Sequence, residues 1–115
     1  MSLKDDSRST ILQNQAGRKM ELFIFARFHA RLGQETGVET ALHKVVLPTR
    51  LEPGCLSIHV FRSIRDPHLF YIHSRWLDEA AFDHHTNQPY TMQFVKEVQP
   101  LIDHALETTR ASFIE

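Results

Sequence analysis

Histidine is the residue of this sequence with the clearest capacity for acid–base chemistry, because it occurs eight times and is spread along the chain. An imidazole titrates near neutrality, so it can accept or release a proton at physiological pH. His85 follows Phe82 by three positions, a spacing that places both side chains on one face of a helix. Trp76, shortly before them, adds an indole N–H donor. These residue types can deprotonate and orient an acidic aromatic molecule, or they can be ordinary core packing.

Three further histidines share odd numbering on predicted strands. His29, His59 and His73 would then point to one side of a sheet, and pairing of Ser63 with Leu69 would place His59 opposite His73. Three converging imidazoles can bind zinc. No carboxylate or cysteine joins them in the pattern, so we favour hydrogen bonding at an interface and expect no metal.

The elements that position these residues follow from hydrophobic periodicity. Alternation of apolar and polar residues predicts strands, and apolar residues three and four apart predict helices. Pro48 should kink or end the first helix, Asp78 should cap the second, and Pro100 should kink the third. The strands are expected over 21–31, 55–64, 68–77 and 108–114, and the helices over 38–46, 78–85 and 89–105.

This order of elements defines a fold class. A β-α-β-β-α-β chain, with its second helical region split in two, predicts an α+β fold of the ferredoxin-like split β-α-β type. Its four-stranded antiparallel sheet would carry the helices on one face. Residues 20–115 form the expected domain, and residues 1–19 form a polar N-terminal extension with a short helix over 9–16.

The two faces of the predicted sheet differ in character. Even-numbered strand positions are nearly all apolar and should lie under the helices. The odd-numbered face is rich in aromatic residues, which indicates an interface rather than a surface in contact with water. We therefore expect a homodimer that forms through this face, a solvated face being the alternative. The aromatic and aliphatic residues concerned are Phe23, Phe25, Phe61, Leu69 and Tyr71.

Composition excludes several classes of partner. The 13 Lys and Arg nearly balance the 14 Asp and Glu, for a formal charge of −1. A nucleic-acid-binding protein would carry a basic surface, so we expect no nucleic acid. No apolar run is long enough for a membrane span, and no signal-peptide core begins the sequence, so we expect no membrane and a cytoplasmic location. Cys55 is the single cysteine, which suits a reducing compartment.

Three sequence runs resemble the antibiotic biosynthesis monooxygenase family. They are VLPTR (46–50) leading into EPGCL (52–56), RW (75–76) followed by EAAFD (79–83) and His85, and Pro89 before the last helix. The resemblance implies a dimeric α/β barrel and an activity like that of quinol or anthrone oxygenases, which use no cofactor. Haem-degrading relatives use an asparagine on the first strand, and none lies between residues 21 and 31, so haem is not expected.

The resemblance also implies a pocket between the helices and the even-numbered sheet face. There, His85 would act as the base and Trp76 as a donor to a small aromatic substrate, quinol-like or polyphenolic, that reacts with O₂. An isomerase of a small carbonyl compound and a non-catalytic small-molecule-binding dimer remain alternatives. The residues expected to contact the substrate are Phe28, Ile72, Ser74, Phe82, Tyr90 and Phe94.

Overall fold

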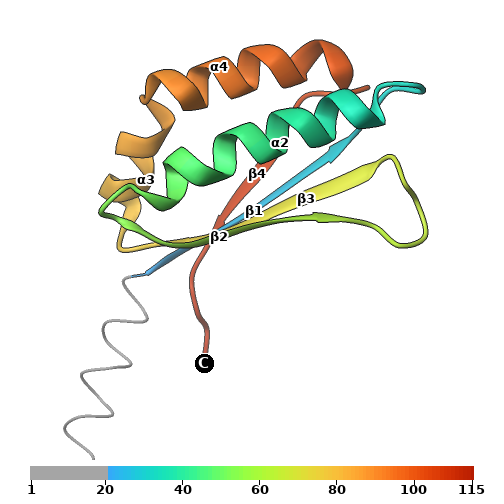
Figure 1. Cartoon of the computed structure of the whole chain (residues 1–115). Coiled ribbons are helices and arrows are strands. Elements are labelled where there is room, and N and C mark those ends of the chain that lie inside the picture. Colours follow the sequence, from blue (N-terminus) through green and yellow to red (C-terminus); the bar gives the residue numbers. More distant parts are fainter. Residues whose placement is uncertain (1–20) are drawn as a thin grey trace, which may run out of the picture.

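The fold is that of a computed structural model, which describes residues 21–115. The expected helix over 9–16 and the extension over 1–19 lie outside the described residues. The elements are β1 (Leu22–His29), α2 (Glu35–Arg50), β2 (Cys55–Arg62), β3 (Leu69–Trp76), α3 (Glu79–Thr86), α4 (Pro89–Val98), the 3₁₀ turn η1 (Gln99–Leu101) and β4 (Glu107–Ala111) (Figure 1). No helix in this part of the chain is long and apolar enough to cross a membrane.

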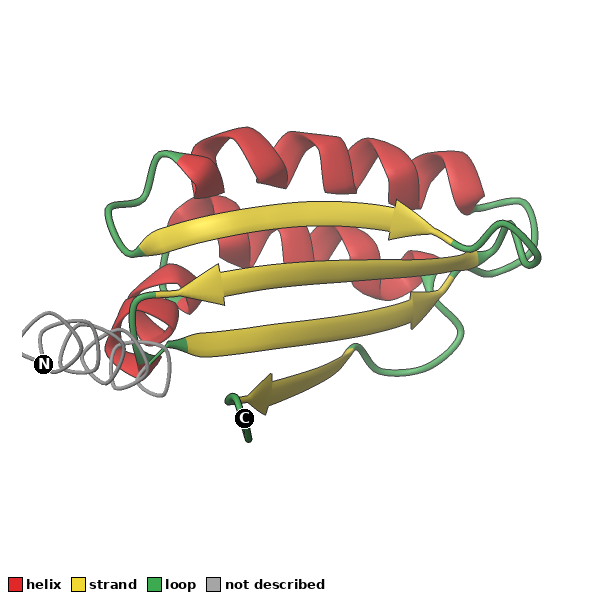
Figure 2. Cartoon of the chain, turned by 90° about the horizontal axis from the view of Figure 1, so that it is seen from below, coloured by secondary structure: helices red, strands yellow, loops and turns green. Residues whose placement is uncertain are grey.

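The four strands form one antiparallel sheet in the order β2-β3-β1-β4. Within residues 21–115, all helices lie on one side of it (Figure 1), and these residues leave its other side uncovered in the view from below (Figure 2). The predicted ferredoxin-like α+β fold is thus confirmed, with the second helical region divided into α3 and α4. The sheet is not closed into a barrel within the single chain.

The core lies between the sheet and the helices, and strand parity predicts most of it. In β1, β2 and β3 one set of alternate residues faces the helices and includes the buried apolar side chains, whereas β4 is mostly exposed. Leu56 is an exception, because the register shifts by one between Cys55 and Ser57 and leaves Leu56 exposed. Such a bulge places two residues opposite one. The buried even-numbered strand residues are Leu22, Ile24, Ala26, Phe28, Ile58, Phe70, Ser74 and Trp76.

The uncovered side of the sheet carries large apolar side chains. Phe25 and Phe61 are 52% and 51% exposed, and Tyr71 between them in the sheet order is 38% exposed. Figure 2 looks onto this side, where no helix crosses the strands. A contiguous aromatic surface of this kind marks an interaction site in a folded domain.

Two proline effects differ from the sequence prediction. Helix α2 continues through Pro48 to Arg50, because a proline in the last turn removes only one hydrogen bond close to the helix end. Helix α4 ends earlier than expected, at Val98, and Pro100 lies in the 3₁₀ turn that follows. Ile102 is then extended and bridges Ala30 of the sheet, so the helix predicted to residue 105 is wrong beyond Val98.

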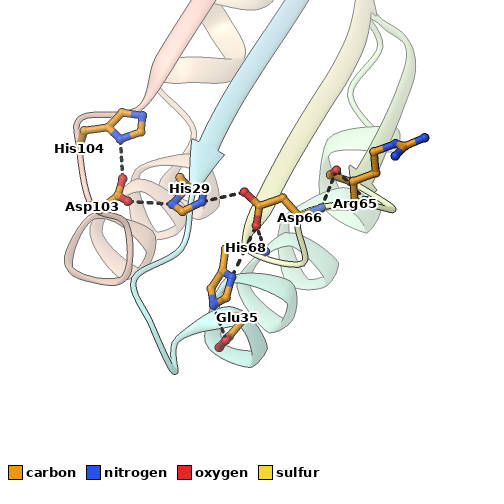
Figure 3. A network of polar contacts seen from close by, with 8 residues as sticks. His29, Glu35, Arg65, Asp66, His68, Asp103 and His104 are labelled. Carbon is orange, nitrogen blue, oxygen red and sulfur yellow. Dashed lines mark hydrogen bonds and ion pairs between the residues drawn. The ribbon is translucent and has the colours of Figure 1, made fainter.

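His29 links three segments at the end of the sheet where β1 finishes (Figure 3). Its Nδ1 lies 2.7 Å from Asp103 Oδ2, before β4, and its Nε2 lies 3.0 Å from Asp66 Oδ2, in the β2–β3 turn. A carboxylate only accepts hydrogen bonds, so both contacts are satisfied together when both ring nitrogens carry protons. Asp103 first and Asp66 second raise the pKa of His29 above its ordinary value.

The His29 bridge predicts a pH-dependent contribution to stability. Because the pKa of His29 is raised in the folded protein, protonated His29 stabilises the fold below about pH 6.5. This stabilisation is lost as the pH rises through the raised pKa. His29 is the chief cause that lowers the pKa of Asp103. The ionised Asp103 carboxylate therefore stabilises the fold above about pH 4, and this stabilisation is lost at lower pH. The melting temperature of His29→Ala should therefore fall further below wild type at pH 5.5 than at pH 8.5.

The measurement is thermal unfolding followed by circular dichroism at the two pH values. His43→Ala is a matched control, because His43 is exposed and its Nε2 lies 3.7 Å from Glu39 of the same helix. Its melting temperature should stay close to wild type at both pH values. An equal deficit of His29→Ala at pH 5.5 and 8.5 would show that the imidazolium bridge adds nothing.

Candidate functional site

A cavity of about 160 Å³ lies between the helices and the buried side of the sheet. Every helix and strand contributes to its wall, and the side chains are mostly aliphatic or aromatic. His85 is the one titratable residue among the described residues of this wall. The lining residues are Ile24, Ala26, Val45, Ile58, Ile72, Ser74, Phe82, His85, Thr86, Thr91, Phe94, Val95, Leu106 and Thr108.

Helix α3 presents His85 to this cavity. The helix begins after Asp78, whose carboxylate accepts the Ala81 N–H at 2.8 Å and satisfies one of the free donors of the first turn. Phe82 and His85 then point to the same side, as their spacing predicts, and both are buried. The His85 side chain is 10% exposed, so its contacts are mainly with protein neighbours.

His85 forms its shortest polar contact with Glu52, in the turn between α2 and β2. His85 Nδ1 lies 2.6 Å from Glu52 Oε2 and 3.3 Å from Thr91 Oγ1. The same carboxylate oxygen accepts a hydrogen bond from the Tyr90 hydroxyl at the start of α4. Residues from three separate segments thus meet at one buried carboxylate oxygen.

This carboxylate is enclosed by protein. The Glu52 side chain is 8% exposed, and its second oxygen, Oε1, is buried without a hydrogen-bond partner in the described part of the chain. Burial first, and the Glu52 contact second, raise the pKa of Tyr90 well above its ordinary value. Tyr90 therefore remains a hydroxyl that donates to Glu52 at neutral pH.

Trp76 packs behind His85 rather than against the cavity. Its ring is fully buried and its centroid lies 4.6 Å from that of His85, with Phe82 at 5.5 Å in an edge-to-face arrangement. The indole N–H donates to Ser74 Oγ at 2.9 Å. That donor is already satisfied within the protein, and Trp76 is not among the residues that line the cavity.

The predicted site residues separate into two groups. His85, Ile72, Ser74, Phe82 and Phe94 all line the cavity. Three others lie outside its wall: Phe28 and Trp76 are fully buried in the core, and Tyr90 contacts Glu52. The residues that sequence reasoning missed are Glu52, Thr91 and Thr86. Glu52 is the first residue of the EPG run. The turn accounts for the other residues of the run but does not require an acidic one, so Glu52 itself was the available signal in the sequence.

The odd-numbered histidines do not converge. His59 does lie opposite His73, as predicted, but His29 pairs with Leu69 at the other end of the sheet. Burial, followed by Arg75 and His59, lowers the pKa of His73, which favours its neutral form. Within residues 21–115, no group of three His, Cys, Asp or Glu side chains has the arrangement to hold a metal ion.

Comparison with known proteins gives two curated relatives. Protein sll1783 of Synechocystis sp. is 33% identical over 55 residues, which are 48% of this chain and 37% of that protein. The present chain therefore spans little more than a third of the length of this relative. Rv0793 of Mycobacterium tuberculosis, whose name proposes a monooxygenase, is 26% identical over 86 residues, covering 75% of this chain and 84% of Rv0793.

The fold and the sequence agree with a single family. The crystal structure of PA3566 from Pseudomonas aeruginosa is similar with a TM-score of 0.78 and 26% identity, covering 85% of this chain and 98% of PA3566. The family model described as antibiotic biosynthesis monooxygenase matches residues 22–97, from the start of β1 into the last turn of α4. The chain belongs to the antibiotic biosynthesis monooxygenase family.

Proposed function

We propose that this protein is a monooxygenase that oxidises a small quinol-like or polyphenolic molecule with O₂ and requires no cofactor. Family membership and the name of Rv0793 support a monooxygenase. The observation that carries the proposal is that His85 is the one titratable side chain among the described residues of a mostly apolar cavity wall. A phenol bound there would meet a single base.

The size and lining of the cavity favour one aromatic ring. A dry cavity of about 150 Å³ holds benzene in another protein, and the volume here is about 160 Å³. Among residues 21–115, no Lys, Arg, Asp or Glu lines the wall, so this part of the chain offers no Lys, Arg, Asp or Glu to pair with a charged substituent. The hydroxyl groups of Ser74, Thr86 and Thr91 can form hydrogen bonds with the oxygen atoms of a neutral hydroquinone.

The chemistry requires the substrate to supply all the electrons. His85 removes a phenolic proton, and the resulting anion is electron-rich enough to reduce O₂. For a hydroquinone, C₆H₆O₂ and O₂ give hydroxyquinone, C₆H₄O₃, and water. One oxygen atom forms a new bond to a ring carbon whose hydrogen is lost, and the other leaves as water. The substrate is oxidised and O₂ is reduced, with no external reductant.

We also propose that the protein works as a homodimer through the uncovered sheet face. Phe25, Phe61 and Tyr71 form an exposed aromatic surface on it. Two such faces packed about a two-fold axis bury each other, since the contact is self-complementary. Neutral His73, opposite His59, can form hydrogen bonds there without burying a charge.

The proposal is tested by oxygen uptake with hydroquinone under an ¹⁸O₂ atmosphere, corrected for the rate without protein. We expect protein-dependent O₂ consumption and a hydroxyquinone that contains one ¹⁸O atom. Consumption of O₂ without ¹⁸O in the product would indicate an oxidase that forms peroxide. Absence of turnover with hydroquinone, methylhydroquinone and menadiol alike would overturn the proposal in favour of a binding protein.

A further inference from the structure

The turn that carries Glu52 is fixed against helix α3. The Glu52 N–H donates to the Thr49 carbonyl at 3.1 Å, and the Cys55 N–H donates to the Glu52 carbonyl at 3.1 Å. At Gly54, an added Cβ would lie 2.4 Å from the Ala81 Cβ of α3. Only glycine allows this approach of the turn to the helix, and the approach holds Glu52 and His85 at a set separation.

The contacts of Glu52 Oε2 determine which nitrogen of His85 carries a proton. The oxygen of a carboxylate accepts hydrogen bonds and cannot donate them. At 2.6 Å from Oε2, Nδ1 must therefore be the protonated nitrogen. Tyr90 donates to the same oxygen and so orients the carboxylate. In a neutral imidazole with Nδ1 protonated, Nε2 carries the lone pair, and Nε2 has no hydrogen-bond partner among residues 21–115.

We infer that Glu52 is a positioning residue, which fixes His85 as the Nδ1–H tautomer and leaves Nε2 as the proton acceptor in the cavity. The catalytic part of this inference rests on the proposed function. The ring packs against both Trp76, at 4.6 Å, and Phe82, at 5.6 Å between centroids, and these contacts support the orientation that the Glu52 hydrogen bond selects. The arrangement is that of a carboxylate–histidine pair that orients a general base.

Glu52 also acts on the charge that His85 acquires. When Nε2 accepts a proton the imidazole becomes a cation, and the adjacent carboxylate stabilises it. The other groups that face His85 are neutral: Thr91 and Tyr90 from α4, Trp76 from β3 and Phe82 from its own helix. Both members of the Glu52–His85 pair are at least nine-tenths buried, so water screens their attraction little.

The tautomer is tested by ¹⁵N NMR of the imidazole nitrogens in the full chain, which needs no substrate. The wild-type His85 signals should show a protonated Nδ1 and an unprotonated Nε2 at pH 8. In Glu52→Leu the acceptor is gone, so the population should move toward the Nε2–H form that free histidine favours. Tyr90→Phe is the matched control, because it removes the other donor to Oε2 and should leave the tautomer unchanged.

Kinetics with the active hydroquinone provide the second measurement. Glu52→Gln keeps a carbonyl acceptor of the same size but removes the charge, so kcat should fall roughly 10- to 100-fold with little change in KM. Glu97→Gln, at an exposed pair with Lys44, should leave both values unchanged. Glu52→Gln also tests the role of Glu52 if Glu52→Leu does not fold.

Two outcomes separate this inference from the proposed function. A wild-type His85 with Nε2 protonated, or an unchanged tautomer in a folded Glu52→Leu, would overturn the positioning role even if turnover of quinols is robust. A wild-type kcat in Glu52→Gln would do the same. If no quinol is oxidised but the tautomer follows Glu52 as expected, the proposed function fails and the Glu52–His85 geometry stands.

Discussion

Replacing His85 with alanine is expected to lower hydroquinone turnover by about 10²-fold or more, the usual loss when a general base is removed. His85 is the sole titratable group of the described cavity wall, so no other side chain of that wall can assume its role. The effect should fall on kcat, because the apolar wall that binds the ring remains. Initial rates of O₂ consumption, measured over a range of substrate concentrations, separate kcat from KM.

His84→Ala is the control for this experiment. His84 is the adjacent histidine of α3, but it is exposed and its Nε2 contacts Gln88 rather than the cavity. Its turnover should equal that of wild type. Turnover of His85→Ala at the wild-type rate would show that the base is elsewhere, and a comparable loss in His84→Ala would point to damage to α3 rather than to chemistry.

Phe25→Asp and Phe61→Asp are each expected to convert the proposed dimer to a monomer or an aggregate. Each substitution would bury a carboxylate without a partner at the centre of an aromatic contact. Truncation of a central aromatic anchor commonly costs at least about 2 kcal/mol, roughly 30-fold in Kd. Because the contact is two-fold symmetric, each substitution acts on both sides of it. Sedimentation velocity at micromolar concentration measures the change.

Met92→Asp is the matched control for the dimer. Met92 is also an exposed apolar residue, 59% exposed, but it lies on α4, on the helical side of the sheet. Its sedimentation should equal that of wild type. A wild-type protein that sediments as a monomer at micromolar concentration would rule out the proposed dimer, whatever the variants do.

The sequence predicted the parts of the fold that depend on local patterns. Alternation along the strands identified the buried side of the sheet, and the short turn after Ser63 set the register that places His59 opposite His73. The short α3 followed from Asp78 and the spacing of Phe82 and His85. In each case neighbouring residues determine the structure, so a single sequence contains the information.

What the sequence could not predict depends on contacts between distant segments. The bulge at Leu56 arises from pairing with β3, and α4 ends at Val98 because Ile102 joins the sheet beside Ala30. Glu52 and His85 are 33 residues apart, so no spacing rule links them. Ser74 likewise takes the indole N–H that the sequence left free for a substrate.

The close approach of Gly54 to Ala81 makes these two positions epistatic. Gly54→Ala would place two Cβ atoms 2.4 Å apart and push α3, with His85, away from Glu52. If residue 81 were glycine, the same alanine would meet only the Cα there, at 3.5 Å, which is an ordinary contact. A residue larger than glycine at position 54 is therefore tolerated only after a change at position 81, and the order in which these substitutions can accumulate is constrained.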